Sequence, residues 1–79
     1  MNKALTLREL FRYLQSGTGV SLYEYAERKY LGYDIVTDYN YDELFEEFLD
    51  CEVVIIEATN NSVINVDIVA EWLESEVKQ

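Results

Sequence analysis

Two segments of the chain carry apolar residues at helical spacing. In the first segment they follow an i, i+3, i+4, i+7 pattern and are Leu7, Leu10, Phe11 and Leu14. Thr6 and Glu9 form a capping-box pattern, in which the threonine hydroxyl accepts from the Glu9 amide and the glutamate reaches back. The pattern predicts a helix from Leu7 to about Gln15.

A second helix is predicted to follow Asn40 and to end near Leu49. Asn40 is a favourable N-cap residue, and Glu43 stands three positions later. The apolar stripe of this helix would be Tyr41, Leu44, Phe45, Phe48 and Leu49. The remaining face would then carry five acids: Asp42, Glu43, Glu46, Glu47 and Asp50.

Residues 20–25 and 30–36 are rich in β-branched and aromatic side chains and flank a polar segment, residues 26–29. This pattern predicts a β-hairpin. The alternative is a helical turn over residues 22–30, because alanine, glutamate and arginine favour helix.

Residues 52–58 and 63–69 flank the segment 59–62, whose two asparagines suit a tight turn, so they predict a second hairpin. Alternation assigns one buried face to Val54, Ile56, Ala58, Ile64, Val66 and Ile68. Asn65 and Asp67 would point outward.

A short C-terminal helix over residues 69–77 completes the pattern, with Trp72, Leu73 and Val77 (or Val69) inward. We therefore expect residues 1–79 to form a single small α+β domain in the order α-β-β-α-β-β. A mostly antiparallel sheet of two hairpins would be covered by two main helices and the C-terminal one.

The composition argues against an enzyme. The 79 residues include no histidine and a single cysteine, Cys51, which excludes an intramolecular disulfide and an ordinary zinc site. Cys51 lacks a histidine base and is expected to fill space beside the second helix. We expect no cofactor, no metal and a cytosolic setting, since neither a signal peptide nor a membrane span is apparent.

Charge is distributed unevenly along the chain, whose net charge is −10. Residues 1–33 hold five bases and three acids, whereas residues 34–79 hold thirteen acids and one base. On the predicted second helix, five carboxylates in nine residues would give one charge per roughly 2.7 Å, between the ~3.4 Å of one DNA strand and the ~1.7 Å of the duplex. Such a face fits a basic groove, and the alternative is a merely solvated face. The net charge opposes direct binding to nucleic acid or anionic membranes.

Six of the seven tyrosines fall between residues 23 and 41. Tyrosine is enriched at protein interfaces, because it buries a large area with few torsions and keeps a hydrogen bond. Tyr39 and Tyr41 flank the acidic segment and are candidate partner-binding residues, although some tyrosines must serve the core.

Residues 38–42 match the opening of a calcium-binding loop. The match ends there, since Glu43 replaces the required glycine and Leu49 the bidentate glutamate. A calcium module is a remote alternative to a helix cap.

The segments LTLREL at 5–10, VSLY at 20–23, LDCEVVII at 49–56 and INVDI at 64–68 resemble small uncharacterised acidic proteins of phages, prophages and mobile elements of Gram-positive bacteria. The resemblance implies a phage context. Phage-encoded acidic proteins include anti-CRISPR and anti-restriction inhibitors, which bind host enzymes and imitate nucleic acid.

Two hypotheses follow. The first is a non-enzymatic protein that occupies a basic surface of a host nucleic-acid enzyme through its acidic face. The second is a homodimer, in which Arg8 and Arg12 of the first helix meet the acidic face of another copy.

Overall fold

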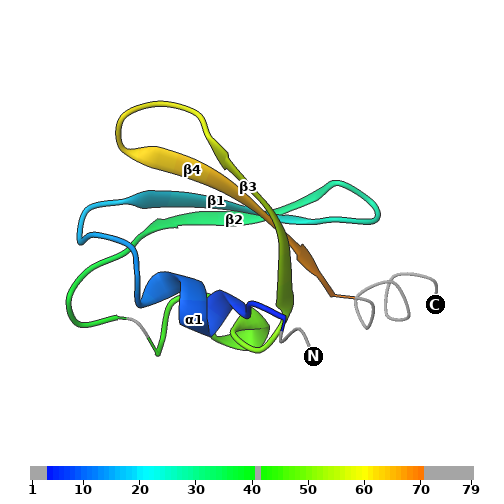
Figure 1. The fold of residues 1–79 in the computed structure, drawn as a ribbon, viewed down its shortest axis with the longest axis horizontal. Helices are drawn as coiled ribbons and strands as arrows, with labels where there is room; N and C mark the ends of the chain where they lie inside the picture. Colours follow the sequence, from blue (N-terminus) through cyan, green and yellow to red (C-terminus); the bar gives the residue numbers. More distant parts are fainter. Residues whose placement is uncertain (1–3, 41, 71–79) are drawn as a thin grey trace.

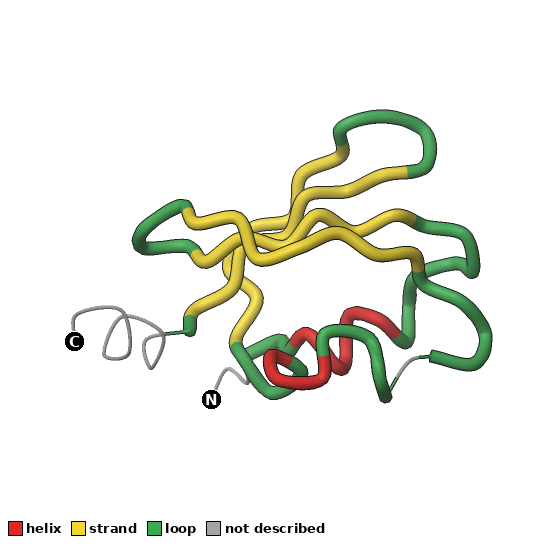
Figure 2. The backbone as a smooth tube through the Cα atoms, turned by 180° about the vertical axis from the view of Figure 1, so that it is seen from behind, coloured by secondary structure: helices red, strands yellow, loops and turns green. Residues whose placement is uncertain are grey.

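The computed structural model has two layers: a four-stranded sheet forms one, and a short helix and an irregular loop form the other (Figures 1 and 2). It describes residues 4–40 and 42–70. The elements are α1 (Leu7–Phe11), β1 (Gly19–Glu24), β2 (Lys29–Ile35), the 3-10 turn η1 (Glu46–Phe48), β3 (Glu52–Ala58) and β4 (Val63–Val69). Both hairpins were predicted correctly, and the helical turn over residues 22–30 does not form.

The predicted fold class is wrong in two respects. The described part of the chain holds one short α-helix in place of two main helices, and its sheet is mixed. The predicted C-terminal helix falls mostly on residues 71–79, which lie outside the described residues, and Val69 belongs to β4. The domain is therefore a small α+β-like unit with a four-stranded mixed sheet.

The two hairpins join through a parallel pairing of their inner strands. The strand order is β2-β1-β4-β3, with Val20 of β1 opposite Ile64 of β4 and Leu22 opposite Val66. Because side chains alternate along a strand, these pairs share one face of the sheet. The helix and the loop cover that face, which we call the covered face (Figure 1).

The hydrophobic core lies between the covered face and these covering segments. It consists of Leu7, Leu10, Phe11, Val20, Leu22, Val36, Leu44, Phe48, Leu49, Val66, Ile68 and Ala70. The sheet, α1 and the loop all contribute, so no pair of elements could bury this set alone.

The predicted capping box starts α1. The Glu9 amide donates to Thr6 Oγ1 at 3.2 Å, and the Thr6 amide donates to Glu9 Oε1 at 3.0 Å. The helix ends earlier than predicted, at Phe11, and continues as tighter i→i+3 turns, with the Tyr13 amide donating to the Leu10 carbonyl.

No helix in the described part of the chain has the length and apolar character to cross a membrane.

Strand β3 keeps the predicted alternation only beyond a bulge, where Ile56 and Ala58 lie opposite Val66 and Ile64 on the covered face. Val54, Ile56 and Ala58, expected to be buried, are exposed. A β-bulge between Val53 and Ile55 shifts the register, so Val53 takes the inward position opposite Ile68. Since β3 is also an edge strand, its remaining apolar side chains extend beyond the cover.

Candidate functional site

The acidic segment after Asn40 does not form the predicted helix. The Asn40 side chain turns back toward β2, where its Oδ1 accepts from the Thr37 amide at 2.9 Å and its Nδ2 donates to the Ile35 carbonyl at 3.0 Å. It closes the end of the strand and is not available to cap a helix. The Asn40 carbonyl still accepts from the Leu44 amide at 2.9 Å, which makes a single turn.

Phe45 ends that turn. Its backbone is left-handed, with φ +52°, a conformation that interrupts a right-handed helix. The ring lies 6.3 Å from that of Phe11, centroid to centroid, and a Cβ at Gly32 would meet it at 3.2 Å. The ring of Phe45 thus packs between α1 and β2 while its backbone is strained. Between Phe45 and β3 the only helical element is the short 3-10 turn η1.

Residues 42–50 therefore form an irregular segment, which we call the acidic loop. Leu44, Phe48 and Leu49 anchor it in the core. All five acids expected on a helical face are exposed, as predicted for their side chains, but they follow no regular spacing: Asp42, Glu43, Glu46, Glu47 and Asp50. The comparison with the phosphate spacing of DNA, which assumed a helix, no longer applies.

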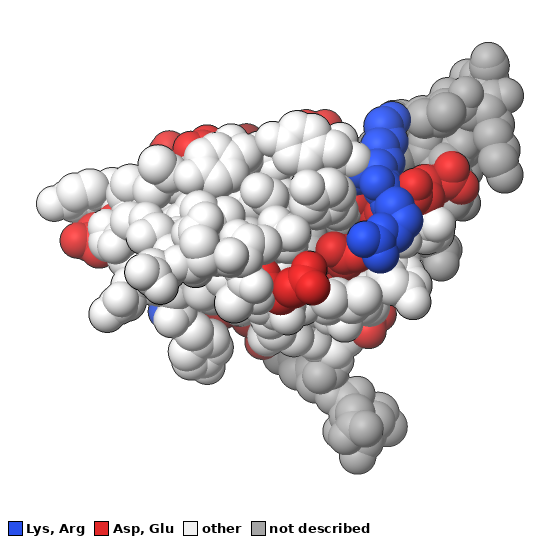
Figure 3. Space-filling model, turned by 90° about the horizontal axis from the view of Figure 1, so that it is seen from above, with Lys and Arg blue, Asp and Glu red and all other residues white. Residues whose placement is uncertain are grey.

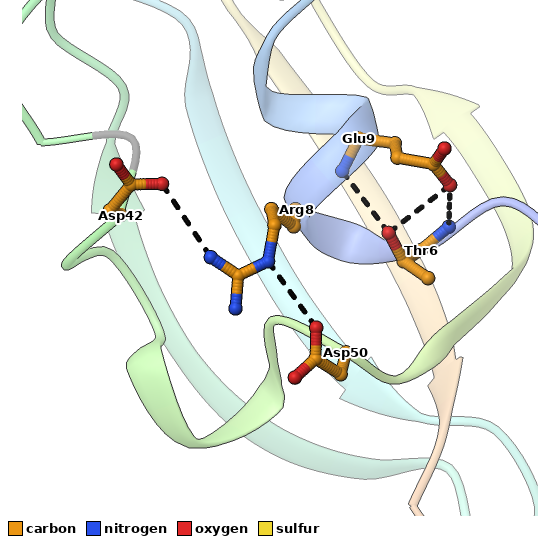
Figure 4. Close-up of polar contacts among 5 residues, drawn as sticks. All are labelled: Thr6, Arg8, Glu9, Asp42 and Asp50. Carbon is orange, nitrogen blue, oxygen red and sulfur yellow. Dashed lines mark hydrogen bonds and ion pairs between the residues drawn. The ribbon is translucent and has the colours of Figure 1, made fainter.

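Arg8 brings two of these acids together (Figure 4). Its Nη1 lies 3.6 Å from Asp42 Oδ1, and its Nε donates to Asp50 Oδ1 at 3.3 Å. Its backbone amide donates to the Leu49 carbonyl at 2.8 Å, so the same residue also fixes the end of the loop. Each exposed pair contributes only ~0–1 kcal/mol, but together they occupy Arg8 within the chain.

The other three acids of the loop are Glu43, Glu46 and Glu47, and they differ from the Arg8 pair. Across residues 4–40 and 42–70 the structure records no ion pair for them. Their charge is therefore directed to solvent or to a partner.

Tyr39 is 93% exposed and stands before the acidic loop. Its amide donates to Thr37 Oγ1 at 3.3 Å, which fixes the turn while leaving the ring outside the core. The other tyrosine predicted for this site, Tyr41, lies outside the described residues.

One of the candidate calcium ligands is already used in a hydrogen bond within the chain. Asn40 Oδ1, which would face the ion, accepts from the Thr37 amide instead. No group of three or more metal-binding side chains gathers anywhere in the described ranges. Cys51 is half-buried against the core, in keeping with a space-filling role.

Sequence reasoning missed a second surface, the face of the sheet opposite α1, which we call the open face. Viewed from that side, it is a broad surface of mostly uncharged side chains, with basic and acidic side chains next to one another toward one end and further acidic ones at its edges (Figure 3). Among the residues that the strand register assigns to it are Tyr23, Tyr30, Tyr33, Ile35, Ile55, Glu57, Asn65 and Asp67. The clustering of tyrosines was the available signal, but their common face depends on the bulge in β2 between Tyr30 and Gly32.

Comparison with known proteins adds no relative. No family model, no curated protein and no solved structure matches the chain.

Proposed function

We propose that this protein is a non-enzymatic binding module whose acidic loop occupies a basic surface of a partner protein. The observation that carries the proposal is the set of three exposed glutamates, Glu43, Glu46 and Glu47, on a loop anchored by buried leucine and phenylalanine side chains. An anchored loop presents its charges with little loss of conformational freedom on binding. Asp42, Asp50 and Tyr39 extend the same surface, and Tyr41 stands between them in the sequence.

The partner we propose is a bacterial enzyme that acts on nucleic acid, in the cytosol of a phage host. A net charge of −10 would speed the encounter with a basic groove, and it disfavours direct binding to nucleic acid. The resemblance to phage-encoded acidic proteins supports the host context. Imitation of nucleic acid would here rest on clustered charge, since the regular spacing of a helix is absent.

A matched pair of variants tests the role of the loop. The tagged protein would be incubated with bacterial lysate, and any captured enzyme would be purified. The binding of that enzyme to nucleic acid would then be measured at increasing concentrations of the present protein. Glu46→Lys/Glu47→Lys should abolish both capture and inhibition. The control Glu27→Lys/Asp34→Lys, at two exposed acids outside the loop, changes the net charge equally and should retain most of both. Equal loss in both variants would show that only net charge matters and would remove the loop from the proposal.

The homodimer hypothesis loses part of its support, because Arg8 is engaged by Asp42 and Asp50 of its own chain. Arg12 is exposed and remains as the one basic residue of α1 and its following turn that could meet another copy. Sedimentation velocity at micromolar concentration tests it: a monomer excludes this dimer, and a dimer that dissociates on Arg12→Glu supports it.

A further inference from the structure

The open face combines aromatic and aliphatic side chains that a folded monomer leaves accessible. Tyr30 is 56% exposed, Tyr33 47% and Ile55 39%. Tyr33 lies across β1, since a Cβ at Gly19 would overlap its ring. Several large exposed apolar side chains on one face of a sheet mark an interaction surface.

Asp67 lies on the open face, on the inner strand β4, toward the end of the sheet at which β1 turns into β2. In the register its neighbours are Tyr23 of β1 and Ile55 of β3, and its exposure is only 6%. The sequence correctly predicted an outward direction for Asp67 but not its burial. No hydrogen bond or ion pair of its carboxylate is recorded in the described part of the chain.

Glu24, the other buried acid among the described residues, shows the usual arrangement. Its carboxylate accepts from the amides of Ala26 and Glu27, at 3.2 and 2.7 Å. Since no fully enclosed side-chain oxygen among the described residues lacks a partner, the unpaired Asp67 carboxylate must reach the surface of the open face. A largely buried carboxylate without a donor is costly, and a donor arriving from outside would relieve that cost.

The rings beside Asp67 restrict what that donor is. Tyr23 and Tyr30 form a tilted pair, with centroids 5.5 Å apart, at the position next to Asp67. A carboxylate flanked by aromatic rings suits an ammonium or guanidinium group, which forms a charge-assisted hydrogen bond and a cation–π contact. The aliphatic side chain of Ile55 on the other side suits the methylene stem of lysine or arginine.

A second copy of the chain is a poor source of this cation. Each copy carries −10, so two copies repel; Arg8 is already paired within its chain, and Arg12 follows α1, on the other side of the sheet. Arg28 and Lys29 lie at the β1–β2 turn, one residue pair beyond Tyr23 and Tyr30, but among the described residues neither forms an ion pair with Asp67. A basic partner complements the face better on charge.

We propose that the open face binds a basic segment of a partner protein, with one lysine or arginine seated on Asp67 beside Tyr23 and Tyr30. The inference rests on the proposed function only in taking the partner to be a basic protein. The surface itself is distinct from the acidic loop, because the loop covers the opposite face of the sheet (Figure 1).

The test uses the isotope-labelled chain of 79 residues and a synthetic peptide of alternating valine and arginine, whose binding is followed by the shifts of the amide NMR signals. We expect saturable shifts at Tyr23, Tyr30, Ile55 and Asp67. The same peptide with citrulline, a neutral isostere of arginine, should bind at least about tenfold more weakly, as expected for loss of a charged hydrogen bond. Shifts confined to the acidic loop would overturn this proposal and leave the proposed function standing.

Two variants complete the design. Asp67→Asn should weaken the binding of the arginine peptide by about tenfold or more, while the NMR spectrum of the variant remains that of a folded protein. Tyr30→Leu, at an exposed position, should weaken it by a smaller factor, so the proposal stays testable even if Asp67→Asn fails to fold. Two results together would overturn the proposal: Tyr30→Leu binds the arginine peptide as tightly as the unchanged chain does, and the citrulline peptide binds the unchanged chain as tightly as the arginine peptide does.

Two cations of the chain, Lys3 and Lys78, lie outside the described residues and are its own further competitors for Asp67. In Lys3→Gln/Lys78→Gln the arginine peptide should bind as it does to the unchanged chain. A clear gain in affinity would show that the chain itself supplies the cation, and the partner proposal would fall.

Discussion

The two faces of the sheet differ in what they do with similar side chains. On the covered face Val20, Leu22, Val66 and Ile68 are fully buried beneath α1 and the acidic loop. On the open face Tyr33, Ile35 and Ile55 stay 39–47% exposed, although each is large and apolar. Among the described residues, α1 and the acidic loop are enough to cover one face of the sheet but not both. Stability therefore depends on one face, and the other is available for binding.

The largest expected effect comes from Phe11, which is fully buried between α1 and the sheet. Phe11→Ala removes a ring from the covered face and should cost about 3–5 kcal/mol of unfolding free energy. A domain of this size has little more to lose, so we expect loss of the folded NMR spectrum at room temperature. A variant that keeps its urea midpoint would show that the core is not on this face.

A pair of glycines compares the faces directly. Gly32 has φ +152°, and a Cβ there would meet Phe45 on the covered face. Gly32→Ala should therefore cost about 1–3 kcal/mol in urea unfolding.

Gly19→Ala is the matched change on the open face. The new Cβ would displace the Tyr33 ring, but that side chain is half-exposed and can turn outward. We expect a loss below about 1 kcal/mol. A Gly19→Ala cost equal to that of Gly32→Ala would contradict the contrast between the faces.

Thr6 tests the helix that provides part of the cover. Thr6→Ala removes the capping interactions with Glu9 and should cost about 1 kcal/mol, measured by urea unfolding. Thr6→Ser keeps the hydroxyl and should retain most of the stability. If neither variant loses stability, the backbone bridge between Thr6 and Glu52, and not the cap, holds this end of the chain.

Thr6 and Asn40 also show how far sequence could predict the fold. Both open a cap-like pattern, yet only Thr6 starts a helix, because the Asn40 side chain binds back to β2. Five acids in nine residues further oppose a helix there, at about 0.2–0.5 kcal/mol per like-charged pair. A tertiary contact that lies outside the local pattern decided the outcome.

The hairpins were predictable because their information is local. Alternating side chains and turn residues fix β3 and β4 within one stretch of sequence, and the predicted bounds of both strands are correct. The parallel contact between β1 and β4 depends on residues more than 40 positions apart in the chain, as for Val20 and Ile64, and no local signal specifies it. The same contact places Tyr23 beside Asp67, so the open face could not be assembled from sequence.

The smallest expected effect is at Ile55, on the open face. Ile55→Ser removes an exposed aliphatic side chain and should change the unfolding free energy by no more than about 0.5 kcal/mol, in contrast to the several kcal/mol expected at Phe11. Urea unfolding at two protein concentrations measures it. A core-sized loss that grows with protein concentration would mean that a second copy covers the open face in solution, and a core-sized loss independent of concentration would mean that the chain covers it itself. A small change at both concentrations, together with weaker binding of the arginine peptide, would separate the side chains that fold this domain from those that bind.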